Sequence, residues 1–121
     1  MEYWKVADLG LGVVITCQGH DKENQVGAAV ARFESLVEQR QGDFTIFADL
    51  RGMTGYETES RRAWQVAFAR LSNRVDGLTL VGAQTALIRM GAAAVAAYAG
   101  IPVQFVASWA EIPGAPAELQ V

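Results

Sequence analysis

The chain has few of the residues that carry reactive chemistry. Its 121 residues include one cysteine, Cys17, and one histidine, His20. A single cysteine excludes an internal disulfide, and one cysteine with one histidine argues against a transition-metal site. We therefore expect Cys17 to be a packed apolar side chain and His20 to be a structural or surface residue.

Targeting and membrane-spanning segments are also missing. The most apolar stretch, Met90 to Ile101, is too short and too rich in alanine and glycine to span a bilayer. The N-terminus has no basic region followed by an apolar one, so we expect no secretory signal. These absences favour a reduced, cytoplasmic protein, and the sequence predicts neither a cofactor nor a metal.

The known catalytic and phosphate-binding motifs are absent as well. The glycines of Gly52 to Gly55 are not followed by a Gly-Lys-Ser/Thr sequence, and no Gly-x-Ser-x-Gly turn occurs. The net charge of −3 argues against non-specific nucleic-acid binding, which requires a basic surface. We therefore expect a protein that is not an enzyme and does not bind nucleic acid.

What the chain does have is enough apolar sequence, 51% of its residues, to build the core of one domain. Along the chain, segments in which apolar residues recur every two residues, as in strands, alternate with segments in which they recur about every 3.6 residues, as in helices. We predict one domain over residues 1–112 and a C-terminal tail over 113–121. The predicted strands cover 3–7, 13–17, 44–48, 78–81 and 103–107. The first predicted helix lies between the cap Asp21 and Gly42, with apolar positions from Val26 to Val37, and the others cover about 57–74 and 86–99.

This order predicts the fold class. Two short strands around a glycine-rich turn form an antiparallel hairpin, and strands that then alternate with helices form a parallel sheet through right-handed crossovers. The sequence thus predicts an α/β protein of order β-β-α-β-α-β-α-β. Its mostly parallel sheet has about five strands and is covered by helices.

The stretch from Asp49 to Ser60 is the strongest candidate for a working surface. It follows an apolar strand, carries glycines and hydroxyl groups, and precedes a helical pattern, so we interpret it as a loop at the carboxyl edge of the sheet. Five arginines but only two glutamates lie in residues 51–74. The candidate partner-binding residues are Asp49, Arg51, Tyr56, Glu57, Arg61 and Arg62.

Glu57 and Arg61 are spaced for an ordinary helical ion pair. Other strand ends reach the same edge of the sheet, and they supply a second set of candidates. These ligand-edge residues are Gly82, Gln84, Thr85 and Ser108.

The helix predicted over 86–99 carries a single charge, Arg89, and six alanines from Ala92 to Ala99. A helix that is apolar all round is expected to be buried on more than one side. Packing against its own sheet, self-association and the lining of an apolar ligand site all remain open.

Several residues and the order of strands and helices together carry a resemblance. The residues are Phe47-Ala48-Asp49-Leu50-Arg51-Gly52-Met53-Thr54-Gly55, Trp64, Leu80-Val81-Gly82 and Val103-Gln104-Phe105-Val106. In these features the chain resembles the STAS superfamily. Within that superfamily the chain resembles the SpoIIAA-like branch, often labelled STAS/SEC14-like. The superfamily includes anti-sigma-factor antagonists and the tails of sulfate transporters, and the resemblance covers nearly the whole chain.

The resemblance implies a site of regulation. In the antagonists, a strand that ends in an Asp-Leu-like pair leads to Asp-Ser, and that serine, at the start of the second helix, is phosphorylated by a partner kinase. Asp49-Leu50 matches the strand end, and Glu57-Thr58 falls where Asp-Ser stands. Thr58 is the implied phosphoacceptor, with Ser60 as a lesser candidate. The alternative from the residues alone is that Thr58 is only a helix cap.

The resemblance therefore implies a regulatory module that binds another protein, a regulator or a kinase. Two alternatives remain. One is a carrier of an apolar or lipid-like ligand, which requires a pocket between sheet and helices near Met90 and Val95. The other is a structural module that forms homo-oligomers, with a homodimer as its simplest form.

Overall fold

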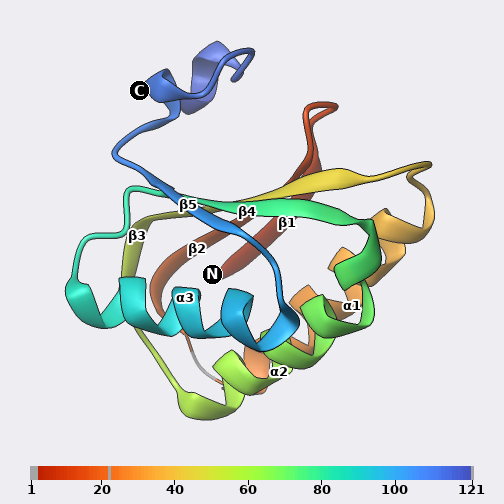
Figure 1. Cartoon of the computed structure of the whole chain (residues 1–121). Helices are drawn as coiled ribbons and strands as arrows, with labels where there is room; N and C mark the ends of the chain where they lie inside the picture. Colours follow the sequence, from red (N-terminus) through yellow and green to blue (C-terminus); the bar gives the residue numbers. More distant parts are fainter. Residues whose placement is uncertain (1–2, 22, 121) are drawn as a thin grey trace.

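The computed structural model describes residues 3–21 and 23–120 (Figure 1). Its strands are β1 (Trp4–Asp8), β2 (Val13–Asp21), β3 (Phe44–Tyr56), β4 (Val75–Val81) and β5 (Val103–Val106). Its helices are α1 (Glu23–Glu38), α2 (Thr58–Arg70) and α3 (Ala86–Ala99), with short 3-10 helices η1 (Ser72–Arg74), η2 (Trp109–Glu111) and η3 (Ala117–Leu119). Within the described residues, no helix combines the length and the apolar character needed to cross a membrane.

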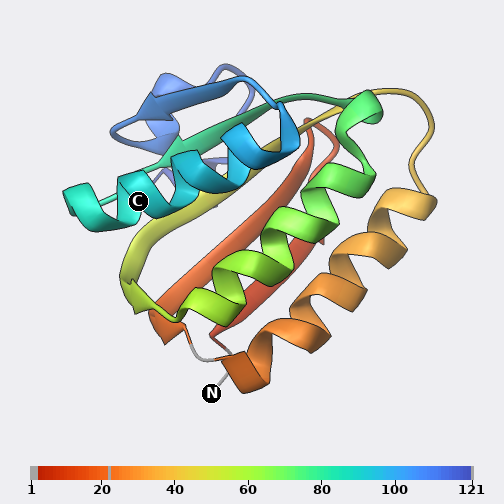
Figure 2. The same cartoon turned by 60° about the horizontal axis from the view of Figure 1, so that its bottom comes forward.

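The five strands form one sheet in the order β1-β2-β3-β4-β5. The β1–β2 pair is antiparallel and the other pairs are parallel, which confirms the predicted α/β fold class. Because the spatial order follows the chain order, every right-handed crossover moves in the same direction and leaves its helix on the same face. Figure 2 shows α1, α2 and α3 side by side across that one face.

The face covered by the helices holds the larger part of the core. Side chains of β2, β3 and β4 such as Ile15, Ile46 and Leu80 are almost fully buried there. Aromatic rings from three elements meet at this face, with centroid separations of 5.2 Å between Trp4 and Trp64 and 5.8 Å between Phe33 and Trp64. These contacts fix α2 against the hairpin and α1.

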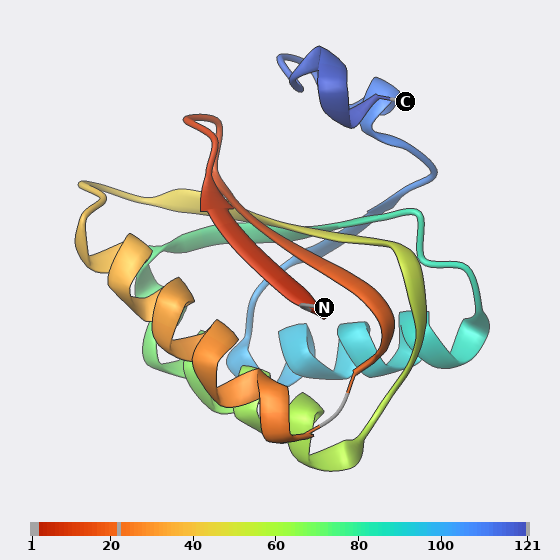
Figure 3. The same ribbon diagram turned by 180° about the vertical axis from the view of Figure 1, so that it is seen from behind.

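The opposite face of the sheet is covered by the C-terminal segment (Figure 3). Trp109 is fully buried there and packs with Val14, Phe47 and Val81. Ala115 and Leu119, from the segment predicted as a tail, pack against the same cluster. This cover explains why strand β3 is apolar on both of its faces.

The prediction of a loop from Asp49 onward is wrong, because β3 continues to Tyr56. Strand β2 is also longer than predicted and runs to Asp21, so that it pairs with β3 along most of its length. The helix predicted over 57–74 ends at Arg70 and is followed by η1, and β4 already begins at Val75. The predicted bounds of α3, Ala86–Ala99, are confirmed.

The prediction that α3 is buried on more than one side is wrong for the single chain. Ile88 and Val95 face the core, whereas Leu87, Met90 and Tyr98 are each more than 60% exposed. The alanines allow close packing against α2 on the inner side. The outer side remains an apolar surface.

Candidate functional site

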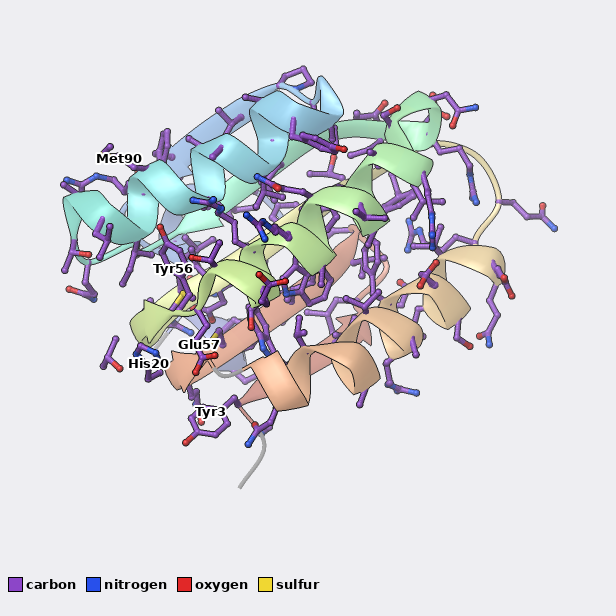
Figure 4. The ribbon with its side chains drawn as sticks, turned by 90° about the horizontal axis from the view of Figure 1, so that it is seen from below. Tyr3, His20, Tyr56, Glu57 and Met90 are labelled. Carbon is purple, nitrogen blue, oxygen red and sulfur yellow. The ribbon has the colours of Figure 1, made fainter. Side chains whose placement is uncertain are left out.

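Strand β3 bends because it carries more residues than its partner β2. Thr16 pairs with Asp49 and Gln18 with Gly52, so β3 contains one extra residue, and a second shift follows between Gly19 and His20. Bulges of this kind bend a strand and increase its twist. The end of β3 therefore curves toward the layer of helices and brings Tyr56 to α3 (Figures 2 and 4).

Three aromatic rings at this end of the sheet each lie against a glycine. A Cβ atom on Gly55 would meet the ring of His20, and one on Gly91 would overlap the ring of Tyr56. The third pair is Tyr3 with Gly19, where the Cβ would lie 3.1 Å from the ring. In Figure 4, Tyr56 reaches α3, while Tyr3 and His20 lie at the ends of the strands. The glycines thus admit rings that fix the curved end of β3.

A cavity of about 70 Å³ lies beneath this curve, between the sheet and helices α2 and α3. Its walls are almost wholly apolar, and its lining includes Leu50, Met53, Ile88 and Val95. Other lining residues, among them Tyr56, Arg61 and Ala92, are only half-buried, so this side of the cavity adjoins the surface. Of the two residues near which the SEC14-like alternative requires a pocket, Val95 lines the cavity, whereas Met90 is exposed and does not.

Two residues that line the cavity carry buried polar atoms without a hydrogen-bond partner. They are Arg61, through Nε, and Trp64, through Nε1. The Oγ atom of Ser60, at the start of the same helix, is also buried without a partner. A buried donor left unpaired costs about 1–3 kcal/mol, so three such atoms on the first turns of α2 mark a place that favours an added acceptor.

The expected ion pair between Glu57 and Arg61 does not form. Among the described residues, Glu59 instead pairs with Arg62, at 2.8 Å between Oε1 and Nη1, and both side chains are more than half exposed. The side chain of Glu57, the residue that precedes α2, makes no capping hydrogen bond. Arg61 is therefore a cation beside the cavity with no carboxylate within 4.0 Å in the described part of the chain.

Thr58 and Ser60, the two phosphoacceptor candidates, lie in different surroundings. Thr58 is exposed and is the first residue of α2, whereas Ser60 is fully buried. A kinase reaches a hydroxyl on the surface, so burial disfavours Ser60. Because Glu57 precedes α2, Thr58 does not act as the cap that the alternative interpretation assigned to it.

Asp49 and Arg51 lie on the opposite face of the sheet, away from the cavity. The Asp49 carboxylate accepts hydrogen bonds from Arg51 Nε at 2.9 Å, Arg51 Nη2 at 2.8 Å and Trp109 Nε1 at 2.9 Å. Burial alone would raise the pKa of Asp49, but the hydrogen bonds from Arg51 and Trp109 and the charge of Arg51 outweigh it and lower the pKa. This buried group links β3 to the C-terminal segment.

The ligand-edge candidates mostly have structural partners. Gln84 Nε2 donates to the Arg51 carbonyl at 3.4 Å, and Gly82 packs against the Arg51 side chain. Thr85 caps α3 by accepting from the Ile88 N–H at 3.2 Å, and Ser108 forms a capping box with Glu111. The strand ends meet at this edge as predicted, but the side chains of Gln84, Thr85 and Ser108 make hydrogen bonds that stabilise the local loops and helix starts.

The structure divides the candidate residues into two groups. Asp49 and Arg51 lie on the face that carries the C-terminal segment, where Gly82 and Gln84 contact Arg51 and Ser108 precedes η2. Thr85 instead belongs to the N-terminus of α3. Tyr56, Glu57, Arg61 and Arg62 cluster with Thr58 where β3 ends and α2 begins. His20 is exposed and Cys17 is buried, and no group of three or more potential metal ligands occurs among the described residues.

Three residues that matter to these sites escaped the sequence analysis. Trp64 was named only among the residues that carry the family resemblance, and neither Gly91 nor Trp109 was assigned a role. The glycine in a helix otherwise built of alanines was a usable signal, because glycine there marks close approach of another group. The contact of Trp109 with Asp49 joins residues 60 positions apart and has no local signature.

A solved structure matches this arrangement over most of its length. It is an uncharacterised protein of the DUF3478 family from Shewanella loihica PV-4, described as having a SpoIIAA-like fold. The TM-score is 0.68 at 8% sequence identity, and the match covers 89% of this chain and 87% of the other. The fold is SpoIIAA-like.

The SpoIIAA-like assignment confirms the predicted resemblance at the level of fold. No protein-family model and no curated protein matches the chain. At 8% identity the likeness extends to the backbone arrangement alone. The role of this SpoIIAA-like domain therefore has to be argued from its own side chains.

Proposed function

We propose that this SpoIIAA-like domain is a non-enzymatic binding module that takes up a small, mainly apolar molecule in the cavity between the sheet and helices α2 and α3. The observation that supports this most strongly is the cavity of about 70 Å³, lined by Leu50, Ile88 and Val95. Protein interiors are normally filled to the density of organic crystals, so an apolar space of this size is available to a guest.

The curve of β3 supports the same proposal. Two bulges curve the end of β3, and the contact between Tyr56 and Gly91 keeps this curved end packed against α3. The hydroxyl of Tyr56 lies 3.4 Å from the carbonyl oxygen of Leu87, at the outer limit of a hydrogen bond. The Tyr56 ring is therefore held mainly by its packing on Gly91, and it forms part of the cavity wall.

A substitution that fills the cavity tests the proposal. Val95→Phe places a ring in the cavity, and we expect it to abolish binding of a small probe, pentan-1-ol, while the fold is retained. The matched control is Val66→Phe, on the exposed side of α2, which leaves binding unchanged. Affinity is measured by NMR titration, and the wild-type dissociation constant is expected to be about millimolar for a ligand of this size. Equal binding by wild type and Val95→Phe would contradict the proposal.

A regulatory role in which the domain binds another protein is the second candidate, favoured by the position of Thr58. It is exposed at the N-terminus of α2, beside Glu57, Arg61 and Arg62. A phosphate there would be tolerated by the free amides and the positive end of the helix dipole. It would add about −1.5 to −2 charges to a surface that binds a regulator or kinase.

A cytoplasmic location and a homodimer remain predictions within this proposal. The exposed apolar side chains of α3, Leu87, Met90 and Tyr98, offer the surface that a second copy would cover. Light scattering over a range of concentrations distinguishes a monomer from a dimer.

A further inference from the structure

We propose that the guest of the cavity is a short-chain carboxylic acid, whose carboxylate is held by Arg61 and Trp64 and whose hydrocarbon part enters the cavity. This inference rests on the proposed function and specifies its ligand. It is supported by the unpartnered donors beside the cavity, by the charge of Arg61 and by the size of the space.

The hydrogen-bonding groups beside the cavity are donors that lack acceptors. Trp64 is only 5% exposed, and both its Nε1 and the Nε of Arg61 are buried without a partner. The two residues are three positions apart on α2, which places them on one side of the helix, and both line the cavity. A ligand that satisfies them must bring acceptor oxygens, which excludes a hydrocarbon and an amine as the best guest.

The charge at this edge favours an anion over a neutral acceptor. Arg61 has no ion-pair partner in the described part of the chain: the pair expected with Glu57 does not form, and Glu59 pairs with Arg62. The guanidinium of an arginine presents parallel N–H donors that match the two oxygens of a carboxylate. The start of α2, which has no side-chain cap, adds the positive end of a helix dipole on the same side.

The size of the cavity limits the length of the hydrocarbon part. An apolar cavity of about 150 Å³ holds the six carbons of benzene, so the space of about 70 Å³ holds about three carbon atoms. The walls that would surround these carbons are apolar, from Leu50, Ile88 and Val95. Pentanoate would place about three carbons inside the cavity and the fourth, with the carboxylate, at its edge beside Arg61, so it is the probe of matching size.

The experiment compares pentanoate with pentan-1-ol, which has the same chain and no charge. Binding to the whole protein is followed by NMR at the indole N–H of Trp64, in wild type and in Arg61→Met. The control is Arg62→Met, which removes an equal charge from an exposed arginine one residue away. We expect wild type and Arg62→Met to bind pentanoate at least about tenfold more tightly than pentan-1-ol. In Arg61→Met this preference should disappear.

The outcomes separate this inference from the proposed function. Equal affinities for acid and alcohol in wild type would overturn the carboxylate assignment and leave the apolar site standing. A preference that survives in Arg61→Met would also overturn it. Failure of both probes to bind would overturn the proposed function as well. Should Arg61→Met fail to fold, Trp64→Phe removes the second donor. Binding to that variant is followed at the backbone amides of α2, and an unchanged preference would equally contradict the inference.

Discussion

At the scale of single residues, Asp49 shows how a polar side chain that resembles a site residue serves the fold. It is 4% exposed and accepts hydrogen bonds from Arg51 and from Trp109. A buried carboxylate is stable only with such partners, because the low dielectric penalises an unpaired charge. The group therefore fixes η2, and with it the C-terminal segment, on the second face of the sheet.

The substitution Asp49→Asn tests this role. We expect it to destabilise the protein by about 2–3 kcal/mol at pH 7, because a buried ionic partner of Arg51 is lost. The folded state lowers the pKa of Asp49 below its value of 3.8, so the contribution is present above that pH and is lost as the pH falls through the folded pKa. The difference between wild type and variant should thus shrink below about pH 4.

Denaturant unfolding over this pH range measures the difference. The control is Asp76→Asn, at an exposed position near the start of β4, which should change stability by less than about 0.5 kcal/mol. A difference that stays constant as the pH falls would show that the Asp49 charge does not stabilise the fold.

At the scale of elements, α3 and β3 show which parts of the fold the sequence determines locally. Helix α3 begins after the cap Thr85 and ends at Gly100, which has a positive φ of 71°, so local chemistry sets both ends and the prediction is confirmed. The end of β3 was predicted as a loop because Gly52, Thr54 and Gly55 are typical loop residues. It is a strand because β2 pairs with it, and that pairing is not local.

The start of α2 carries a prediction at the same scale. Thr58 is exposed and its substitution leaves the core intact, so Thr58→Glu should change the melting temperature by less than about 2 °C. If the domain is a regulatory module that binds another protein, the added negative charge should abolish capture of that partner from an extract of the cells that naturally produce this protein. Gln65→Glu, farther along α2, adds the same charge and is the control.

Partner capture that is equal in wild type and Thr58→Glu would contradict the switch. A melting temperature of Thr58→Glu that is more than about 2 °C below that of wild type would show that the residue has a structural role instead. Either result leaves the cavity and its ligand unaffected, because Thr58 does not line the cavity.

At the scale of the whole molecule, the sequence predicted the architecture but left open whether a cavity lies between the sheet and the helices. The order of elements predicted one mostly parallel sheet with right-handed crossovers. The placement of all three helices on one face follows from the spatial order of the strands, which the structure shows. A cavity is a space that side chains from β3, α2 and α3 leave unfilled, and no pattern along the chain records it. The cover of the second face by Trp109 was missed for a similar reason, since it depends on contacts far apart in sequence.

The same scale explains how the two groups of candidate residues can coexist. The C-terminal segment closes one face of the sheet through the Asp49 group. The other face, under α2 and α3, retains the cavity. One face of the sheet is thus covered by the C-terminal segment, whereas the cavity on the other face adjoins the surface at Tyr56 and Arg61.

The most direct test of the central claim is an NMR structure-mapping experiment on the methyl-labelled wild-type protein with pentan-1-ol. We predict intermolecular nuclear Overhauser effects from the probe to the methyl groups of Leu50, Ile88 and Val95, which line the cavity. Effects confined to Leu87 and Met90 on the exposed side of α3, or none at all up to the solubility limit of the probe, would contradict the claim that this domain binds a small apolar molecule inside.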